Sequence, residues 1–243
     1  MAMKTWQGMA AAGLLLAGGG AQAALVPYTS DGVDLVFDND YTPVGASSPG
    51  LTWTADANLA ASETFSVSGI NTNGTMTWDK ALEWIDAMNA ANYAGANDWR
   101  LWSALNSDGS GPCGPAFDCD DSELGHLFYV EGGLLQNQAI TSSPALNADT
   151  FPATGVFTNL QDAVYWSGTE FSASGAWRFL THIGGQNVGR KGSQDYGWAV
   201  RPGQIAAAPL PGTALLMALG LAGLGARKLG GSGNRGFGGF RGQ

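Results

Sequence analysis

The stretch Thr77–Leu101, TWDKALEWIDAMNAANYAGANDWRL, carries the strongest helical pattern of the chain. Thr77 is a residue type favoured as a helix N-cap, and apolar residues follow it at helical spacing. These residues are Trp78, Ala81, Leu82, Ile85 and Met88. The polar side chains between them, Asp79, Lys80, Glu83 and Asp86, can face water. The pattern predicts an amphipathic helix that ends near Tyr93-Ala94-Gly95.

A second, shorter helix is predicted downstream, from Ser122 to about Val130. Asp120 or Asp121 would cap its N-terminus, because a carboxylate can accept hydrogen bonds from the first free N–H groups. Its buried stripe would consist of Leu124, Leu127 and Phe128.

Strands are predicted on both sides of these helices. Residues 33–38 and 65–69 alternate at period two, and Asn73-Gly74 is a hairpin-type turn. The last third holds three aromatic-rich runs, at residues 164–166, 177–182 and 197–201, separated by Gly and Ser clusters. Helices in the middle and an antiparallel sheet at the end indicate the α+β class.

Both ends of the chain have the composition of export signals. In residues 1–23, Lys4 precedes an apolar core, and Ala21-Gln22-Ala23 fits a signal-peptide cleavage site after Ala23. At the other end, residues 208–229 comprise Pro209-Leu210-Pro211, an uncharged run and the basic pair Arg227-Lys228. This run is too short for a stable membrane span, so we expect transient anchoring only. The Gly-rich residues 230–243 are predicted to be disordered.

The segment between these ends is acidic and rich in tryptophan. All 20 Asp and Glu lie in it, with only six of the 11 Lys and Arg, and so do eight of the nine Trp. The negative charge argues against nucleic acid as a partner. Most of the Trp, about six, are expected to be core residues.

Two cysteines, Cys113 and Cys119, enclose a five-residue loop. In an exported protein such a pair predicts a disulfide, worth about 2–2.5 kcal/mol by the chain-entropy argument. The spacing does not fit C-x-x-C redox chemistry, and two ligands alone do not make a zinc site.

The middle of the chain resembles the Lcl C-terminal domain family, a bacterial domain of unknown function. The similarity covers residues 51–203 of a domain at residues 24–207. Its most specific motifs are Asp98-Trp99-Arg100-Leu101, Tyr165-Trp166-Ser167-Gly168-Thr169 and Trp198-Ala199-Val200-Arg201. The resemblance implies a C-type-lectin-like fold, also found in the formylglycine-generating enzyme, with two helices and a twisted antiparallel sheet. It also implies export and surface attachment, and glycan binding in at least some members.

The C-terminal segment resembles the PEP-CTERM sorting signal, here with Pro-Leu-Pro as the motif. This resemblance implies an exosortase-type membrane protease as a partner during export. It also implies a final location in the envelope, at the surface or in the extracellular matrix of a Gram-negative bacterium.

Two sequence motifs that are typical of enzymes are absent from the chain. There is no Gly-x-Ser-x-Gly elbow and no His-Glu-x-x-His, and the two histidines, His126 and His182, lie far apart. We therefore expect no catalytic residues. The expected function is that of an exported, non-catalytic module of the surface or extracellular matrix that binds a glycan or another surface polymer. A secreted polysaccharide-acting enzyme and a purely structural envelope protein are the alternatives.

An acidic cluster in the DCDDSE segment is a candidate calcium site. It consists of Asp118, Asp120, Asp121 and Glu123. Calcium takes six to eight oxygen ligands, and closely spaced carboxylates could supply several. The other interpretation is helix capping at Ser122. No other cofactor is expected.

Four of the six basic residues of the domain gather near its end. They are Arg178, Arg190, Lys191 and Arg201. Arg190 and Lys191 would lie at one edge of the sheet, where they could bind an anionic polysaccharide together with Arg178. Trp198 would stack on a sugar ring of this ligand. The alternative is that the basic residues pair with the domain's own acids.

Overall fold

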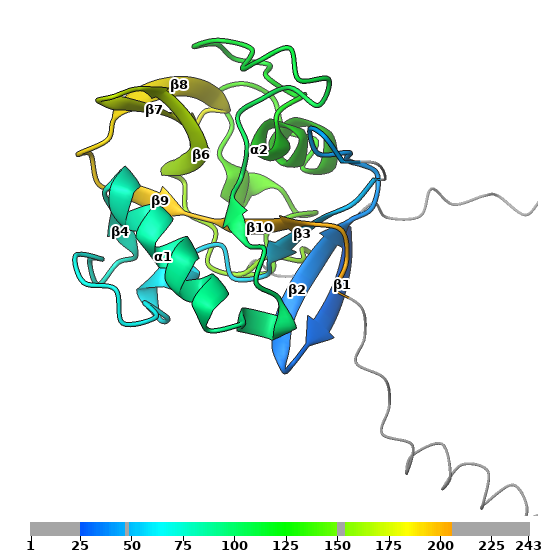
Figure 1. Ribbon diagram of the computed structural model, residues 1–243. Helices are drawn as coiled ribbons and strands as arrows, with labels where there is room; N and C mark the ends of the chain where they lie inside the picture. The colour runs from blue at the N-terminus through cyan, green and yellow to red at the C-terminus, as the bar shows by residue number, and fades with distance from the viewer. Residues whose placement is uncertain (1–24, 47–48, 150–153, 206–243) are drawn as a thin grey trace, which may run out of the picture.

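A computed structural model of the chain describes residues 25–46, 49–149 and 154–205 (Figure 1). The strands are β1 (Leu25–Ser30), β2 (Val33–Asp38), β3 (Leu51–Thr54), β4 (Thr75–Met76), β5 (Arg100–Leu101), β6 (Val164–Ser172), β7 (Gly175–Leu180), β8 (Gly185–Arg190), β9 (Asp195–Gly197) and β10 (Ala199–Pro202). The helical elements are α1 (Trp78–Ala90), α2 (Glu123–His126), the π-helical turn η3 (Leu127–Glu131) and the 3-10 turns η1 (Leu59–Ala61), η2 (Tyr93–Gly95) and η4 (Ile140–Ser142).

The strands form two five-stranded sheets. Their orders are β1-β2-β3-β10-β5 and β4-β9-β6-β7-β8. Trp198 alone separates β9 from β10, so the chain passes directly from one sheet into the other at this residue. The α+β class is confirmed. The expectation of one antiparallel sheet is wrong, because the late strands are divided between two sheets and β6 pairs with β9 in parallel.

Helix α1 confirms the prediction for the stretch around residues 77–90. Thr77 is its N-cap, and its side chain accepts a hydrogen bond from the backbone N–H of Lys80. Trp78, Ala81, Ile85 and Met88 are buried as expected, together with Trp84. The helix lies in front of the junction of the two sheets (Figure 1) and packs against β5, β6 and β9.

The tryptophans of the domain are more deeply buried than expected. All eight Trp of the described residues are at most 7% exposed. Trp198 is fully buried between Trp53, Phe157 and Tyr165, and its indole N–H donates to the carbonyl of Thr54 at 3.0 Å. The Trp residues therefore form the cores on either side of the sheet junction.

The second helix differs from its prediction at both ends. Ser122, not Asp120 or Asp121, is the N-cap, and its hydroxyl accepts from the N–H of Gly125 at 3.3 Å. The Asp121 carboxylate accepts instead from the Ser107 hydroxyl, at 2.5 Å. After only four α-helical residues the chain widens into the π-helical turn η3. Leu124, Leu127 and Phe128 are buried as predicted.

Two further segments depart from the sequence pattern. Residues 65–69 form turns and no strand, because Phe65 and Ser66 adopt positive φ angles of 50° and 66°. Asn73-Gly74 is a turn, but it leads into the two-residue β4 and not into a hairpin. The edge strand β8, which lies between the predicted runs at residues 177–182 and 197–201, was not predicted, and it pairs with β7 along its whole length.

No helix within the described ranges is long and apolar enough to cross a bilayer. The predicted signal peptide at residues 1–23 and the segments at residues 208–229 and 230–243 lie outside the residues that the structure describes.

Candidate functional site

A tight hairpin forms one wall of a polar groove. The two-residue turn Asp31-Gly32 joins β1 to β2, and both residues have positive φ angles, of 48° and 79°. This is the backbone that Asp-Gly favours in a hairpin whose strands twist together. The Ser30 hydroxyl donates to the carbonyl of Ala94 at 2.8 Å, which fixes the hairpin against η2.

The groove beside this hairpin has a volume of about 590 Å³. Its walls come from the hairpin, from the residues after β3, from Tyr93 and from residues 155–158. Backbone bonds hold these walls together: the N–H of Ala55 donates to the carbonyl of Asp34 at 3.2 Å, and that of Thr158 donates to Ala55 at 2.9 Å. Asp34 and Asp56 consequently line the same groove.

Two carboxylates and two phenols are the main polar groups of the groove. Asp34 Oδ1 accepts from the Thr29 hydroxyl at 3.0 Å, and Asp56 Oδ1 accepts from the N–H of Asn58 at 2.8 Å. Among the described residues, the second carboxylate oxygen of each has no hydrogen-bond partner, and neither has the Tyr93 hydroxyl. The Tyr28 hydroxyl is paired with that of Thr52, at 3.0 Å.

Tyr93 is held in its neutral form. Burial raises the pKa of its phenol to about 12, and the nearby charges of Asp56, Glu63 and Asp34 act in the same direction. A neutral phenol can both donate and accept a hydrogen bond. The groove therefore offers acceptors at Asp34 and Asp56 and a donor at Tyr93.

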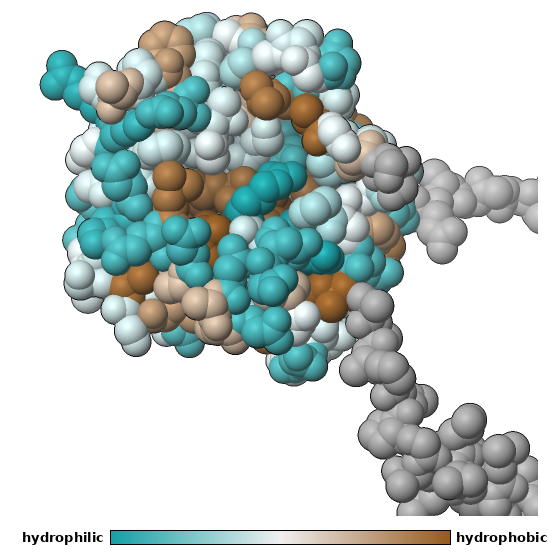
Figure 2. Space-filling model, in the orientation of Figure 1, coloured by the Kyte–Doolittle hydropathy of each residue, from teal (hydrophilic) through white to brown (hydrophobic). Residues whose placement is uncertain are grey.

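A second hollow, of about 620 Å³, lies between α1, β5 and β6. Hydrophobic residues gather in the middle of the face that carries α1, with hydrophilic residues around them (Figure 2). Arg100 and Glu123 close one side of this hollow with a two-point ion pair, at 2.7 and 2.5 Å. The N–H of Ser103 also donates to Glu123, at 2.7 Å. Arg100 and Glu123 thus satisfy one another, whereas Asp86, the third charged residue of this hollow, is exposed.

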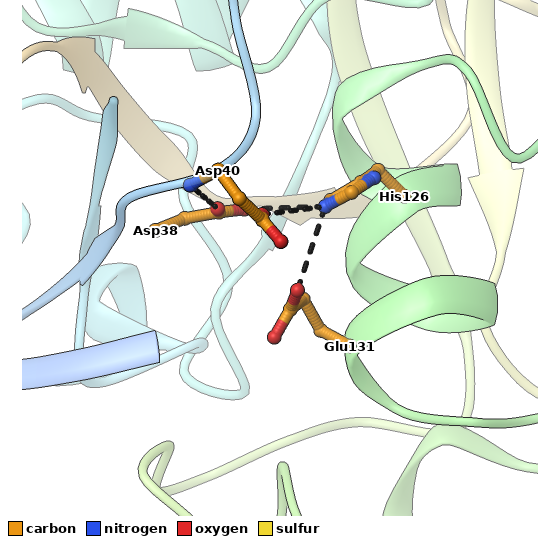
Figure 3. A group of neighbouring side chains, drawn as sticks. All are labelled: Asp38, Asp40, His126 and Glu131. Atoms are coloured by element: carbon orange, nitrogen blue, oxygen red, sulfur yellow. Dashed lines mark hydrogen bonds and ion pairs between the residues drawn. The ribbon is translucent and has the colours of Figure 1, made fainter. Parts of the chain in front are cut away.

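A separate cluster brings a histidine together with three carboxylates (Figure 3). His126 Nε2 lies 3.2 Å from Asp40 Oδ1, 3.6 Å from Glu131 Oε1 and 3.9 Å from Asp38 Oδ2. One ligand-type atom from each of the four residues lies within 4.8 Å of all the others. In the described part of the chain, this is the one group of three or more His, Cys, Asp and Glu that converges in this way.

Local structure explains why these four side chains meet. Asp38 ends β2, and Asp40 lies in the loop that follows (Figure 3). His126 and Glu131 are five residues apart, which in an α-helix would place them about 140° apart around the axis. The η3 turn has the wider π-helical path, with the N–H of Gly132 donating to the carbonyl of Leu127 at 2.9 Å. This path brings Glu131 round to the side of His126.

The protonation of the cluster reflects its burial. Burial raises the pKa of Asp38 to about 7, and the hydrogen bond with Asp40 adds to this, whereas the charge of His126 opposes it. Burial alone would lower the pKa of His126, but Glu131, Asp38 and Asp40 raise it above its ordinary value. The site therefore favours an imidazolium, or another cation, among the carboxylates.

The acidic cluster expected to hold calcium is not assembled. Glu123 is 1% exposed and turned inward to Arg100, and Asp121 is bonded to Ser107. Asp118 and Asp120 remain in the loop before the helix, and the four carboxylates do not converge within the described residues. The structure therefore does not bring together the four carboxylates predicted as a calcium site, Asp118, Asp120, Asp121 and Glu123, within the described residues.

The basic residues near the end of the domain mostly pair with its own acids. Arg178 lies 2.9 Å from Asp195, and Arg201 makes a two-point contact with Asp98 at 2.6 and 3.0 Å. Lys191 forms an ion pair with Glu170 and lies 4.1 Å above the Trp78 ring.

Arg190 and Lys191 do lie together in a shallow hollow at the β8 edge, with Ser174 and Ser193. Arg190 is the one of the four basic side chains without an ion-pair partner in the described segments. Trp198 cannot stack on a ligand there, because it is fully buried at the sheet junction. Its assignment as a ligand-binding residue is wrong.

The disulfide prediction is confirmed. Cys113 and Cys119 are bonded to each other, with 5.8 Å between their Cα atoms.

No protein-family model matches this chain, and no curated protein matches it. The residues and their geometry therefore carry the functional argument.

Sequence reasoning missed both groups that the structure assembles. The dipeptide Asp31-Gly32 was a usable signal for the hairpin beside the groove, since it stands between two apolar-patterned runs. For the His126 cluster, the sequence pattern was misleading. Asp38 alternates with Val33, Leu35 and Phe37, which predicts a solvent-facing side chain, but Asp38 is fully buried.

Proposed function

We propose that this protein is an exported, non-catalytic domain that binds a glycan of the cell surface or the extracellular matrix. The ligand site would be the groove lined by Tyr28, Asp34, Asp56 and Tyr93. One observation carries the proposal: two carboxylates and a neutral phenol face one open groove with hydrogen-bonding capacity to spare.

The chemistry of the groove suits an uncharged sugar. Sugar hydroxyls donate to carboxylate oxygens, and such charge-assisted bonds are stronger than those between neutral groups. Tyr28 and Tyr93 add apolar ring surface and a polar end. The acidic groove would repel an anionic polymer. An anionic polysaccharide is proposed only for the Arg190 and Lys191 edge, where the internal pairing of Lys191 weakens the case.

The wider setting belongs to the same proposal. The resemblance to the Lcl C-terminal domain family supports a C-type-lectin-like arrangement of the α+β fold. The PEP-CTERM-type tail supports transport to the envelope of a Gram-negative bacterium, processing by an exosortase-type protease, and display at the surface or in the matrix.

Binding measurements on the full chain test the groove. The panel contains soluble neutral glucans (dextran and amylose), alginate and dextran sulfate. We expect binding to a neutral glucan and a loss of about tenfold or more in affinity in Asp34→Asn/Asp56→Asn, because charge-assisted bonds become neutral ones. The matched control is Asp86→Asn/Asp120→Asn, which removes the same charge from two exposed positions outside the groove.

Three outcomes count against the proposal. Equal losses in both double variants would point to a general charge effect. Binding to dextran sulfate alone, lost in Arg190→Glu, would move the site to the β8 edge. Release of reducing ends from any glycan would favour the enzymatic alternative, in which Asp34 and Asp56 form a catalytic carboxylate pair.

A further inference from the structure

Among the described residues, Asp38 Oδ2 is the one carboxylate oxygen that is buried without a hydrogen-bond partner. The Asp38 side chain is 1% exposed. Its Oδ1 accepts from the N–H groups of Tyr41 and Asp40, at 3.2 and 3.4 Å, but Oδ2 is buried with no hydrogen-bond partner. An unsatisfied buried carboxylate oxygen is costly, and such groups are rare in folded proteins unless something else satisfies them.

The surroundings of this oxygen are those of a cation site. We infer that Asp38, Asp40, His126 and Glu131 bind a divalent transition-metal ion of the zinc type. One imidazole nitrogen and carboxylate oxygens form a ligand set that zinc accepts, and four ligands are its usual number. The imidazole favours zinc over calcium or magnesium, which take oxygen ligands.

The distances agree with this inference. Zinc–ligand bonds of about 2.0–2.2 Å in a tetrahedron place neighbouring ligand atoms about 3.3–3.6 Å apart. His126 Nε2 lies 3.2, 3.6 and 3.9 Å from the three carboxylates. All four ligand atoms lie within 4.8 Å of one another, so side-chain rotations that bring the carboxylate oxygens closer together would complete the coordination.

The charge balance points the same way. Three carboxylates surround one imidazole, and none of the salt bridges within the described residues joins a Lys or Arg to any of them. When all three carboxylates are ionised, a protonated histidine offsets only one of their charges. A dication would offset more of it and would also satisfy Asp38 Oδ2.

The position of the site suggests what the metal does for the fold. Asp38 and Asp40 follow β2, whereas His126 and Glu131 belong to α2 and η3, so the ion would link the first sheet to the short helix (Figure 3). The Tyr41 ring packs against His126, at 4.9 Å between centroids, and holds the imidazole in place. Since Asp40 is half exposed, an ion can enter from the solvent side.

Zinc titration of the full chain without a histidine tag, stripped with a chelator, tests this inference. Calorimetry should show one saturable Zn²⁺ per chain, tighter than Ca²⁺, and Zn²⁺ should raise the Tm. Asp40→Asn and Glu131→Gln should each weaken zinc binding more than about tenfold. The matched controls are His182→Gln and Glu83→Gln, which change the other histidine and an exposed glutamate and should bind as the wild type does.

The fold of each variant is checked by circular dichroism without metal, and Asp40→Asn is the decisive variant because its side chain is half exposed. Absence of saturable zinc binding would overturn the inference, and so would binding that is unchanged in folded Asp40→Asn and Glu131→Gln. Loss of binding in His182→Gln, or tighter binding of Ca²⁺ than of Zn²⁺, would also overturn it. None of these results depends on whether the groove binds a glycan.

Discussion

At the residue scale, buried charge is the main feature of this protein. Glu123 lies under Arg100 and Ser103 and accepts three hydrogen bonds from them. A buried carboxylate with this many partners is costly to remove, because each donor then loses its acceptor. The pair fixes the start of α2 relative to β5.

We predict that Glu123→Ala lowers the free energy of unfolding by about 2 kcal/mol, because the Ser103 N–H loses its acceptor, whereas the Arg100 side chain is 36% exposed and can be partly solvated. Chemical denaturation of the full chain measures it. Glu83→Gln is the control: it alters the exposed Lys80–Glu83 pair and should change stability by less than about 0.5 kcal/mol. Similar losses in the two variants would show that the Arg100–Glu123 pair is no more important than a surface pair.

At the element scale, α2 is placed by a very close approach to the disulfide loop. A Cβ atom added at Gly125 would lie 1.8 Å from the carbonyl oxygen of Cys119 and 2.7 Å from the Ser122 hydroxyl. Glycine is required here by contact, and not by its backbone angles. The same contact orients His126, the next residue, toward Asp38 and Asp40.

Gly125→Ala should therefore destabilise the protein by at least about 2 kcal/mol, although alanine is the better helix former by about 1 kcal/mol. Thermal and chemical unfolding measure the loss. Gly192→Ala is the control, because no atom lies within 4 Å of a Cβ added there. A Gly125→Ala variant as stable as the wild type would mean that α2 does not pack on Cys119 as described.

The helices and strands also show which parts of the fold could be predicted from the sequence. Helix α1 was predictable because its cap and its apolar spacing are local properties of the chain. The π-helical turn was not predictable, because its wider path depends on the tertiary packing of Leu127 and Phe128 and not on a local sequence pattern. The strand predicted at residues 65–69 does not form for the same reason. The Phe65 ring packs on Trp84 and Tyr93, and this tertiary contact overrides the alternating apolar pattern of the sequence.

At the scale of the whole molecule, both candidate sites are formed by segments distant in sequence. The groove combines the β1–β2 hairpin with Tyr93 and residues 155–158. The cluster combines Asp38 with His126, 88 positions later. Composition and motifs predicted the α+β class, the disulfide and most of the buried aromatic residues. They could not predict either site, because long-range contacts determine which of the 20 acidic residues meet.

Long-range ion pairs also explain why the basic residues near the end of the domain leave little free positive charge at the surface. Arg178, Lys191 and Arg201 each meet an acid from another part of the chain, so most of the local positive charge is offset within the fold. Unpaired polar groups also line the groove of Asp34, Asp56 and Tyr93, where one carboxylate oxygen of each aspartate and the Tyr93 hydroxyl have no hydrogen-bond partner among the described residues. We expect glycan binding at this groove.

Chemical-shift mapping locates the glycan-binding surface residue by residue. Amide resonances of the isotope-labelled full chain are followed while the neutral glucan with the highest affinity in the panel, or a short oligosaccharide of it, is added. We predict saturable shifts at Asp34, Asp56, Tyr93 and the neighbouring Val156, with Arg190 and Ser193 unchanged and the sugar recovered intact. Shifts confined to the β8 edge, or no shift with any glucan, would contradict the account.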